Sequence, residues 1–270
     1  MTLTRRTRLL IGLGASVALA FIYVPLIVVL VNSFNVSKVF SWPPRGWTLT
    51  WWNKALVNEG VRTAVMTSVK AGLGATAIAM VLGSMFSVAV VRYRWFGRDS
   101  LSLLVLLPIA LPGIVTGIAL NSSFRTVLGP LGISFGLFTV VLGHATFCIV
   151  VVFNNVAARL RRTGQSLQEA SMDLGATTWQ TFRFVTFPAV RSALIAGALL
   201  SFALSFDEIV VTSFTAGPGI QTLPQWIFNN LFRPNQAPIV NAVAGALVVL
   251  FIIPVYLAQR LSDGSSGGRI

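Results

Sequence analysis

Residues 63–91 read TAVMTSVKAGLGATAIAMVLGSMFSVAVV, and Lys70 is the only charged side chain among them. A helix of about 20 apolar residues crosses the hydrocarbon core of a bilayer, which is ~30 Å thick. Because lipid offers backbone N–H and C=O groups no hydrogen-bond partner, a span of this kind forms a helix. The stretch therefore predicts a transmembrane helix.

Similar windows, poor in charge, lie on both sides of this stretch. The first follows Arg5, Arg6 and Arg8 and also suits a cleaved signal peptide, but its apolar run exceeds the ~7–15 residues of a signal peptide's hydrophobic region. We therefore expect a retained span, and an all-α integral membrane protein with six transmembrane helices in a single domain, residues 1–270. The expected spans are residues 9–31, 63–91, 100–124, 133–157, 192–216 and 239–259.

The composition excludes several classes of protein. Twenty Lys and Arg against 7 Asp and Glu give a net charge of +13, which by itself would suggest nucleic-acid binding. However, 55% of the chain is hydrophobic and only 10% is charged, whereas soluble domains carry about 25% charged residues. We expect a lipid environment and no nucleic acid. One cysteine, Cys148, and one histidine, His144, exclude an intrachain disulfide and a multi-histidine metal site.

The basic residues also predict an orientation. In a six-span chain, 13 of the 20 Lys and Arg residues fall in the termini and connections on one side, 6 fall on the other, and Lys70 lies within a span. The side richer in Lys and Arg is the cytoplasmic one in membrane proteins. Both termini and the segment 159–191 are then cytoplasmic.

Two spans carry packing signals. Ala193, Gly197, Ser201 and Ser205 recur every four residues and form a stripe of small side chains that permits close helix contact, within this chain or with another subunit. In the third span Pro108, Pro112 and Gly113 should bend or loosen the helix. Such a break is tolerated beside protein or a water-filled cavity, so Pro112 and Gly113 are candidates for a pathway wall.

The expected cytoplasmic segment, residues 159–191, is longer than a simple connection requires. Ser166-Leu-Gln-Glu169 has the spacing of a capping box, in which the Ser166 hydroxyl accepts the Glu169 backbone N–H and the Glu169 carboxylate accepts the Ser166 N–H. This predicts a short helix that begins at Ser166.

A second short helix should follow the first. Gly175 suits the left-handed position after a helix, and Thr177 or Thr178 can cap a helix that runs towards Phe187. Pro188 marks the entry into the fifth span. We expect two short helices joined by a glycine bend.

The same residues carry a family signature. Glu169-Ala170-Ser171-x-x-x-Gly175, with Pro188 thirteen residues later, resembles the EAA loop of permease subunits of binding-protein-dependent ABC importers. Ser171 replaces the second alanine of that motif, with the spacing kept. The resemblance covers nearly the whole chain and is strongest to the putrescine and spermidine (polyamine) branch, on the stretches 32–35, 42–52, 111–120, 144–148, 205–208 and 217–218.

That resemblance implies a set of partners. Such a permease forms a heterodimer with a second permease subunit and works with two ATPase subunits and an extracytoplasmic binding protein in the bacterial inner membrane. The EAA loop is the coupling helix that docks on the ATPase. The chain has no Walker A sequence, so ATP and Mg²⁺ would be used by the ATPase subunit, and we expect no cofactor and no catalytic residue here. Carried over to this sequence, the coupling residues are Ser166, Glu169, Ala170, Asp173 and Gly175.

Charged residues within the spans bear on the solute. Ionisable side chains in a span are costly unless they face a cavity or a partner, and Asp207, Glu208 and Lys70 are the exceptions. A carboxylate in the outer half of the fifth span could meet an ammonium group, as a polyamine would require. The alternative is a structural ion pair with Lys70.

Other functions fit the residues less well. His144 and Cys148 share a helix face, which favours an interhelical hydrogen bond over an incomplete metal site. Gly132-Ile-Ser134-Phe-Gly136 matches the G-x-S-x-G of serine hydrolases, but on one helix His144 would lie ~15 Å from Ser134. A secondary transporter usually shows two related halves, and no repeat is evident. An importer for an amino-acid derivative or an iron species stays open.

Overall fold

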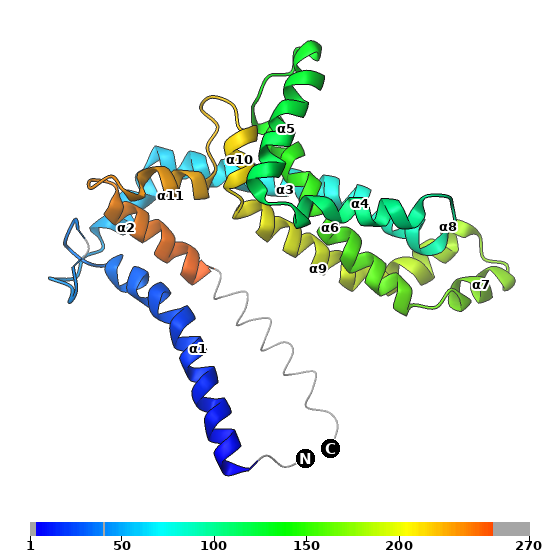
Figure 1. Ribbon diagram of the computed structural model, residues 1–270, viewed down its shortest axis with the longest axis horizontal. Helices are drawn as coiled ribbons and strands as arrows, with labels where there is room; N and C mark the ends of the chain where they lie inside the picture. Colours follow the sequence, from blue (N-terminus) through cyan, green and yellow to red (C-terminus); the bar gives the residue numbers. More distant parts are fainter. Residues whose placement is uncertain (1–3, 40, 251–270) are drawn as a thin grey trace. The chain divides into compact units, whose positions relative to one another are not determined.

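The computed structural model of the protein describes residues 4–39 and 41–250 (Figure 1). Their regular secondary structure is helical, with one isolated antiparallel bridge between Asn35 and Trp47, so the expected all-α class is confirmed for the described chain. The elements are α1 (Arg5–Asn32), α2 (Thr50–Val57), α3 (Glu59–Arg92), α4 (Arg98–Ala110), α5 (Gly113–Val127), η1 (Gly129–Leu131), α6 (Leu137–Arg162), α7 (Ser166–Asp173), α8 (Thr178–Thr181), η2 (Phe182–Thr186), α9 (Phe187–Phe206), α10 (Val210–Thr215), α11 (Leu223–Leu231) and a further apolar helix, Ala237–Leu250.

The described residues form two compact units, one made of those before residue 63 together with those after residue 226, and one of residues 63–226. In the first unit the buried Asn35 organises the loop after α1. Its Nδ2 donates to the Ser41 Oγ at 3.0 Å, and its carbonyl oxygen accepts the Trp51 Nε1–H at 2.9 Å. These bonds seat Trp51 of α2 against the loop.

The second unit is built around α6, whose buried residues lie along most of its length. On one side α9 packs against it through the predicted stripe of small residues. The Gly197 position lies against Val152, and the Ser201 Oγ donates to the Cys148 carbonyl oxygen at 3.3 Å. The stripe thus packs within this chain.

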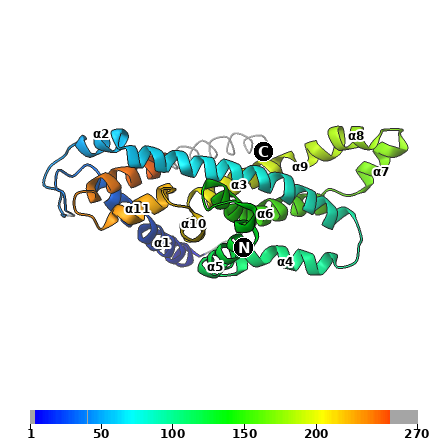
Figure 2. The ribbon, with the colours of Figure 1, turned by 90° about the horizontal axis from the view of Figure 1, so that it is seen from above.

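A second stripe, on α3, was not predicted. Ala71, Ala75 and Ala79 are fully buried at four-residue spacing, and Gly83 and Ser87 continue the same face. The Ser87 Oγ donates to the Phe153 carbonyl oxygen of α6 at 3.0 Å, and a Cβ on Gly83 would meet Val152 at 2.9 Å. Small side chains thus bring α3 into contact with α6, and α3, α6 and α9 lie side by side (Figures 1 and 2).

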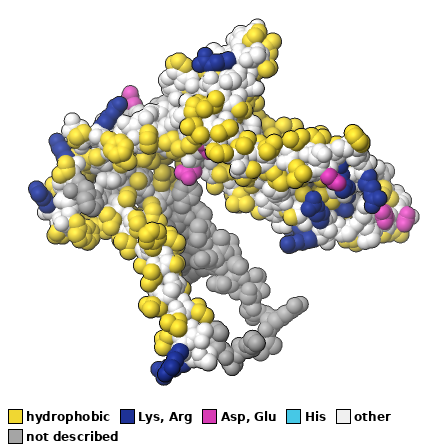
Figure 3. All heavy atoms as spheres, in the orientation of Figure 1, with side chains coloured by type: hydrophobic (Ala, Val, Ile, Leu, Met, Phe, Trp, Pro, Cys, Tyr) yellow, Lys and Arg dark blue, Asp and Glu magenta, His cyan; other side chains and the backbone are white. Residues whose placement is uncertain are grey.

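Four described helices are long and apolar enough to cross a membrane: α1, α3, α6 and the continuous stretch Thr178–Phe206. A fifth span is possible if α4 and α5 count as one. Hydrophobic side chains cover much of the visible surface, and several Lys and Arg side chains lie together near α7, with others elsewhere in the view (Figure 3). The sixth expected span, 239–259, lies partly outside the described residues. Residues 239–250 of it are described and belong to the helix Ala237–Leu250.

The third expected span is bent at Pro112 and Gly113, as the sequence predicts. The structure divides residues 100–124 into α4 and α5, which meet at 108°. Leu111 and Pro112 are both extended, with ψ of 145° and 134°. Proline disfavours the helical conformation of the residue before it, and Pro112 supplies no N–H to continue α4.

The fourth and fifth spans also have different limits. The α6 helix begins at Leu137 rather than 133, because Gly132 adopts a positive φ of 74° and Gly136 is extended. The fifth expected span, 192–216, ends as a helix at Phe206, and α10 begins at Val210 after a break. The break falls on the acidic pair.

Candidate functional site

The predicted coupling segment contains the two short helices that the sequence indicates, but its first cap differs. The α7 helix begins at Ser166 as expected, yet its N-cap residue is Gln165, which has helical backbone angles and makes no side-chain cap. The Glu169 N–H donates instead to the Gln165 carbonyl oxygen at 3.1 Å. The predicted capping box is therefore wrong, because Ser166 already lies inside the first turn.

The bend between the helices is as predicted. Gly175 adopts a left-handed φ of 84°, and the Ala176 N–H donates to the Ser171 carbonyl oxygen at 3.1 Å, which closes the end of α7. Thr177 then caps α8: its Oγ1 accepts the Gln180 N–H at 3.3 Å, and its own N–H donates to the Gln180 Oε1 at 2.8 Å. The capping box lies here, one helix later than expected.

The α7 helix has an inner face and an outer face. On the inner face the Gln168 Nε2 donates to the Thr186 Oγ1 at 2.7 Å, and the Ser171 and Thr181 hydroxyls lie 3.2 Å apart. The predicted coupling residues Ser166, Glu169, Ala170, Asp173 and Gly175 are all exposed, and neighbouring Leu174 is 90% exposed. The segment thus presents an acidic and apolar surface while its other face is fastened to the chain.

The inner face of α7 contacts the beginning of a candidate span. From Thr178 the helix continues to Phe206, passing through π-helical turns at η2. The Arg159 Nε at the end of α6 donates to the Ala189 carbonyl oxygen at 2.8 Å, so α6 also holds the start of α9. The Gly175 bend separates α7 from this helix along the chain, so α7 is linked to it by the Gln168–Thr186 and Ser171–Thr181 contacts.

The acidic pair lies at the break between α9 and α10 rather than within a continuous helix. Asp207 is exposed and is the C-cap residue that follows the last residue of α9, Phe206. Glu208 is half-buried, and its Oε1 accepts the Val211 N–H at 2.7 Å. Glu208, which precedes the N-cap residue Ile209, therefore accepts an N–H of the first turn of α10, and Asp207 is the carboxylate that remains for another partner.

His144 of α6 contacts both sides of this break. It is fully buried, its Nδ1 lies 2.7 Å from the Ser205 Oγ in the last turn of α9, and its Nε2 lies 2.8 Å from the Thr212 Oγ1 in α10. Cys148 contacts the Ser201 carbonyl oxygen at 3.4 Å. The expected interhelical hydrogen bonds are confirmed, although the sequence did not identify the partners.

The break between α4 and α5 adjoins the break between α9 and α10. A Cβ on Gly113 would lie 3.5 Å from the Val210 Cβ, and Gly117 packs against the Phe214 ring so closely that a Cβ would overlap it. The Asn121 Nδ2 donates to the Phe214 carbonyl oxygen at 2.5 Å. The structure thus brings the two candidate pathway segments, Pro112–Gly113 and Asp207–Glu208, into one region, where α5 crosses α10 (Figure 1).

Three alternatives that the sequence offers lose support: an ion pair of Lys70 with the acidic pair, a metal site, and a Ser134–His144 pair. Arg98–Asp99 is the only ion pair that the described chain forms, so Lys70 pairs with neither Asp207 nor Glu208. Within those same residues no group of three His, Cys, Asp or Glu side chains could hold a metal. Both ring nitrogens of His144 are engaged by Ser205 and Thr212, and Ser134 is not among its partners.

The chain belongs to the family of inner membrane components of binding-protein-dependent transport systems, whose model matches residues 77–265. It is 34% identical over 248 residues to the putrescine transport system permease protein PotI of Escherichia coli (strain K12), covering 89% of this chain and 87% of that protein. It is 33% identical over 263 residues to the spermidine/putrescine transport system permease protein PotC of the same strain, covering 97% of both chains. The sequence resemblance to ABC importer permeases is thereby confirmed.

Solved structures share the fold. A chain of a bacterial ABC transporter that imports the acidic polysaccharide alginate superposes with a TM-score of 0.69 at 15% identity, over 98% of this chain and 99% of that one. A chain of the methionine ABC transporter MetNI in an inward-facing conformation gives 0.52 at 20% identity, over 77% of this chain and 96% of that one. This chain therefore shares its fold with chains of two ABC transporters.

Proposed function

We propose that this chain is one of two permease subunits of an ATP-driven importer and lines half of the pathway for a polyamine, putrescine or spermidine. The observation that carries the proposal is the identity to two polyamine permeases over most of the chain. The exposed Asp207, in the region of the Pro112–Gly113 break, gives a chemical reason for a polyamine as the solute, since a carboxylate attracts an ammonium group.

The proposed topology has six spans with both termini in the cytoplasm of a bacterial cell. The basic residues of the sequence support it, and so does the packing of the second unit. The contacts of Gly83 and Ser87 with α6 show that α3 runs parallel to α6. Those of Gly197 and Ser205 show that α9 runs antiparallel to α6. These directions are the ones that the second, fourth and fifth of six successive spans require. The α4–α5 pair is the third span, broken where it meets the pathway.

The proposed coupling contact is made by the outer face of α7, with Glu169, Ala170, Asp173 and Gly175 towards an ATPase subunit and Ser166 at the start of the helix. The partners are a second permease, two ATPase subunits that use ATP and Mg²⁺, and an extracytoplasmic binding protein. Support comes from the exposure of this face and from the unbroken helix between Thr178 and Phe206. This chain supplies positioning and no hydrolytic chemistry.

A second solute has one specific observation in its favour. The chain is 29% identical over 254 residues to a putative 2-aminoethylphosphonate transport system permease protein, PhnV, of Salmonella paratyphi A. That solute also carries an amine, which Asp207 could meet. An amino-acid derivative or an iron species has no comparable support, and the family description disfavours a secondary transporter.

The test is uptake in cells that carry the complete importer, with and without this chain. Radiolabelled putrescine and spermidine should enter only when the chain is present, and excess unlabelled 2-aminoethylphosphonate should not compete. Polyamine uptake that does not depend on the chain, or inhibition of the labelled uptake by unlabelled 2-aminoethylphosphonate but not by unlabelled polyamine, would contradict the polyamine assignment.

A further inference from the structure

A groove lies between α3, α4 and α6, on the side where α3 and α6 end and α4 begins. It is lined by side chains from all three helices. They include Val91 of α3, Arg98, Leu103 and Leu106 of α4, and Phe153 and Arg161 of α6.

The groove is polar at one end and apolar at the other. Leu106 lies eight residues after Arg98 on α4, and Phe153 lies eight residues before Arg161 on α6, so each apolar side chain is ~12 Å along its helix from an arginine. Because both arginines line the same groove at helix ends, the apolar floor extends from them along the helices. Ser102 and Asn154 lie between and add hydrogen-bonding groups.

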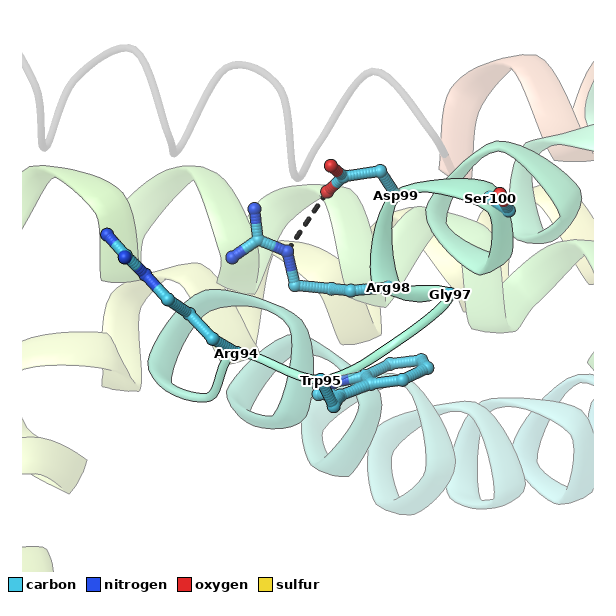
Figure 4. A pocket seen from close by; sticks show the side chains of 6 residues that line it. All are labelled: Arg94, Trp95, Gly97, Arg98, Asp99 and Ser100. Carbon is cyan, nitrogen blue, oxygen red and sulfur yellow. Dashed lines mark hydrogen bonds and ion pairs between the residues drawn. The ribbon is translucent and has the colours of Figure 1, made fainter.

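The polar end carries an excess of positive charge. A neighbouring depression shares Arg98 and Asp99 with the groove and adds Arg94 and Trp95, so that three arginines and one carboxylate line the two together. The Arg98 Nε donates to the Asp99 Oδ1 at 3.0 Å, and Figure 4 shows the Arg98 guanidinium between Arg94 and Asp99. Asp99 is 87% exposed and engages a single nitrogen, which leaves the other guanidinium nitrogens for an anion.

The apolar end is open to the surroundings. Leu103 is 69% exposed, and none of the residues of α4 is buried. Exposed leucines of this kind are stable in lipid, and a tryptophan such as Trp95 favours the headgroup level of a bilayer. An occupant must therefore combine a negatively charged, phosphate-like head with a hydrocarbon tail.

We propose that this groove binds an anionic phospholipid of the cytoplasmic leaflet. Arg98 and Arg161 hold the phosphate, since guanidinium groups match its geometry with paired hydrogen bonds. One acyl chain lies along Leu103 and Leu106. The lipid fills the space between α4 and the α3–α6 pair next to the broken third span, and basic pockets between spans on the cytoplasmic side suit such headgroups.

Native mass spectrometry of the intact purified importer tests this site, with phosphatidylglycerol and phosphatidylcholine as probes. The double variant Arg98→Gln/Arg161→Gln should bind phosphatidylglycerol about ten-fold less tightly than the unmodified importer. The matched control Arg5→Gln/Arg8→Gln removes the same charge from α1, outside the groove, and should bind as before. Equal loss in both variants, or no loss in either, would overturn the proposal.

Two further arms separate lipid from a free anion. The variant Leu103→Gln leaves the arginines intact and should weaken phosphatidylglycerol binding, whereas inorganic phosphate at millimolar concentration should not displace the lipid. Displacement by phosphate with no effect of Leu103→Gln would show an anion site that takes no lipid. Polyamine uptake is a separate readout, so failure of the lipid site would leave the proposed transport function standing.

Discussion

The imidazole of His144 joins the two sides of the break between α9 and α10, with its Nε2 2.8 Å from the Thr212 Oγ1 and its Nδ1 2.7 Å from the Ser205 Oγ. Both hydroxyls and the ring are buried. The geometry of the acidic turn therefore depends on a side chain from a different helix.

Replacing His144 with leucine should destabilise the purified importer by about 1–3 kcal/mol, because buried hydroxyl groups lose their partner. Thr212→Val should reduce the stability less. The double variant should lose less stability than the sum of the two single losses, as measured by thermal unfolding. The exposed Thr126→Val is the control and should have no effect. Strictly additive effects of His144→Leu and Thr212→Val would show that the two side chains do not interact.

The two acidic residues of the turn should respond differently to substitution. Asp207→Asn should raise the polyamine concentration needed for half-maximal uptake, because it removes the exposed carboxylate. Glu208→Gln keeps an oxygen that can accept the Val211 N–H and should change uptake little, whereas Glu208→Ala removes the cap. Concentration-dependent uptake separates these outcomes, and a larger effect of Glu208→Gln than of Asp207→Asn would reverse the roles assigned here.

Close contact between α5 and α10 predicts a contrast between two glycines. Gly117→Ala should destabilise the protein by ~1–3 kcal/mol, since the added methyl group would overlap the Phe214 ring. Gly113→Ala should be tolerated, because its methyl group would make ordinary contact with Val210 at 3.5 Å. Phe214→Leu should partly restore the stability lost in Gly117→Ala. Thermal unfolding measures these effects, and equal destabilisation by Gly113→Ala and Gly117→Ala would argue against this packing.

The bend after α7 predicts a conformational effect without a steric one. Gly175 has a φ of 84° and open space around it, so Gly175→Ala should cost ~1–2 kcal/mol from backbone strain alone. Gly129→Ala also has open space but no positive φ, and it is the matched control. Protease sensitivity of the segment should increase only for Gly175→Ala. Equal sensitivity in both variants would mean that the bend does not require glycine.

Local sequence signals predicted those parts of the fold that depend on neighbouring residues. The α3 span follows from its apolar run, Gly175 from the need for a left-handed residue, and the Thr177 cap from its position before α8. The capping box at Ser166 failed because the choice of the first helical residue depends on Gln165, whose backbone angles no side-chain pattern specifies.

Features that depend on distant residues could not be predicted in this way. The sequence marks Pro112 as a break but does not set the 108° between α4 and α5, which depends on where Gly117 and Asn121 contact Phe214. Apolar residues lie on both sides of Asp207 and Glu208, so residues 192–216 suit a single span and do not by themselves predict the break that His144 and Glu208 stabilise. The different environments of Asp207 and Glu208 likewise arise from tertiary contacts.

The central claim is that the exposed face of α7 couples this chain to an ATPase that drives polyamine import. The most direct measurement is accumulation of radiolabelled putrescine by proteoliposomes that hold the complete importer, with ATP and Mg²⁺ on the ATPase side and the binding protein on the other. Glu169→Ala should abolish most ATP-dependent accumulation and reduce co-purification of the ATPase. Glu59→Gln, which changes another exposed glutamate in a first helical turn, should leave both unchanged. Accumulation that persists without ATP, or that is unaffected by Glu169→Ala, would contradict the account.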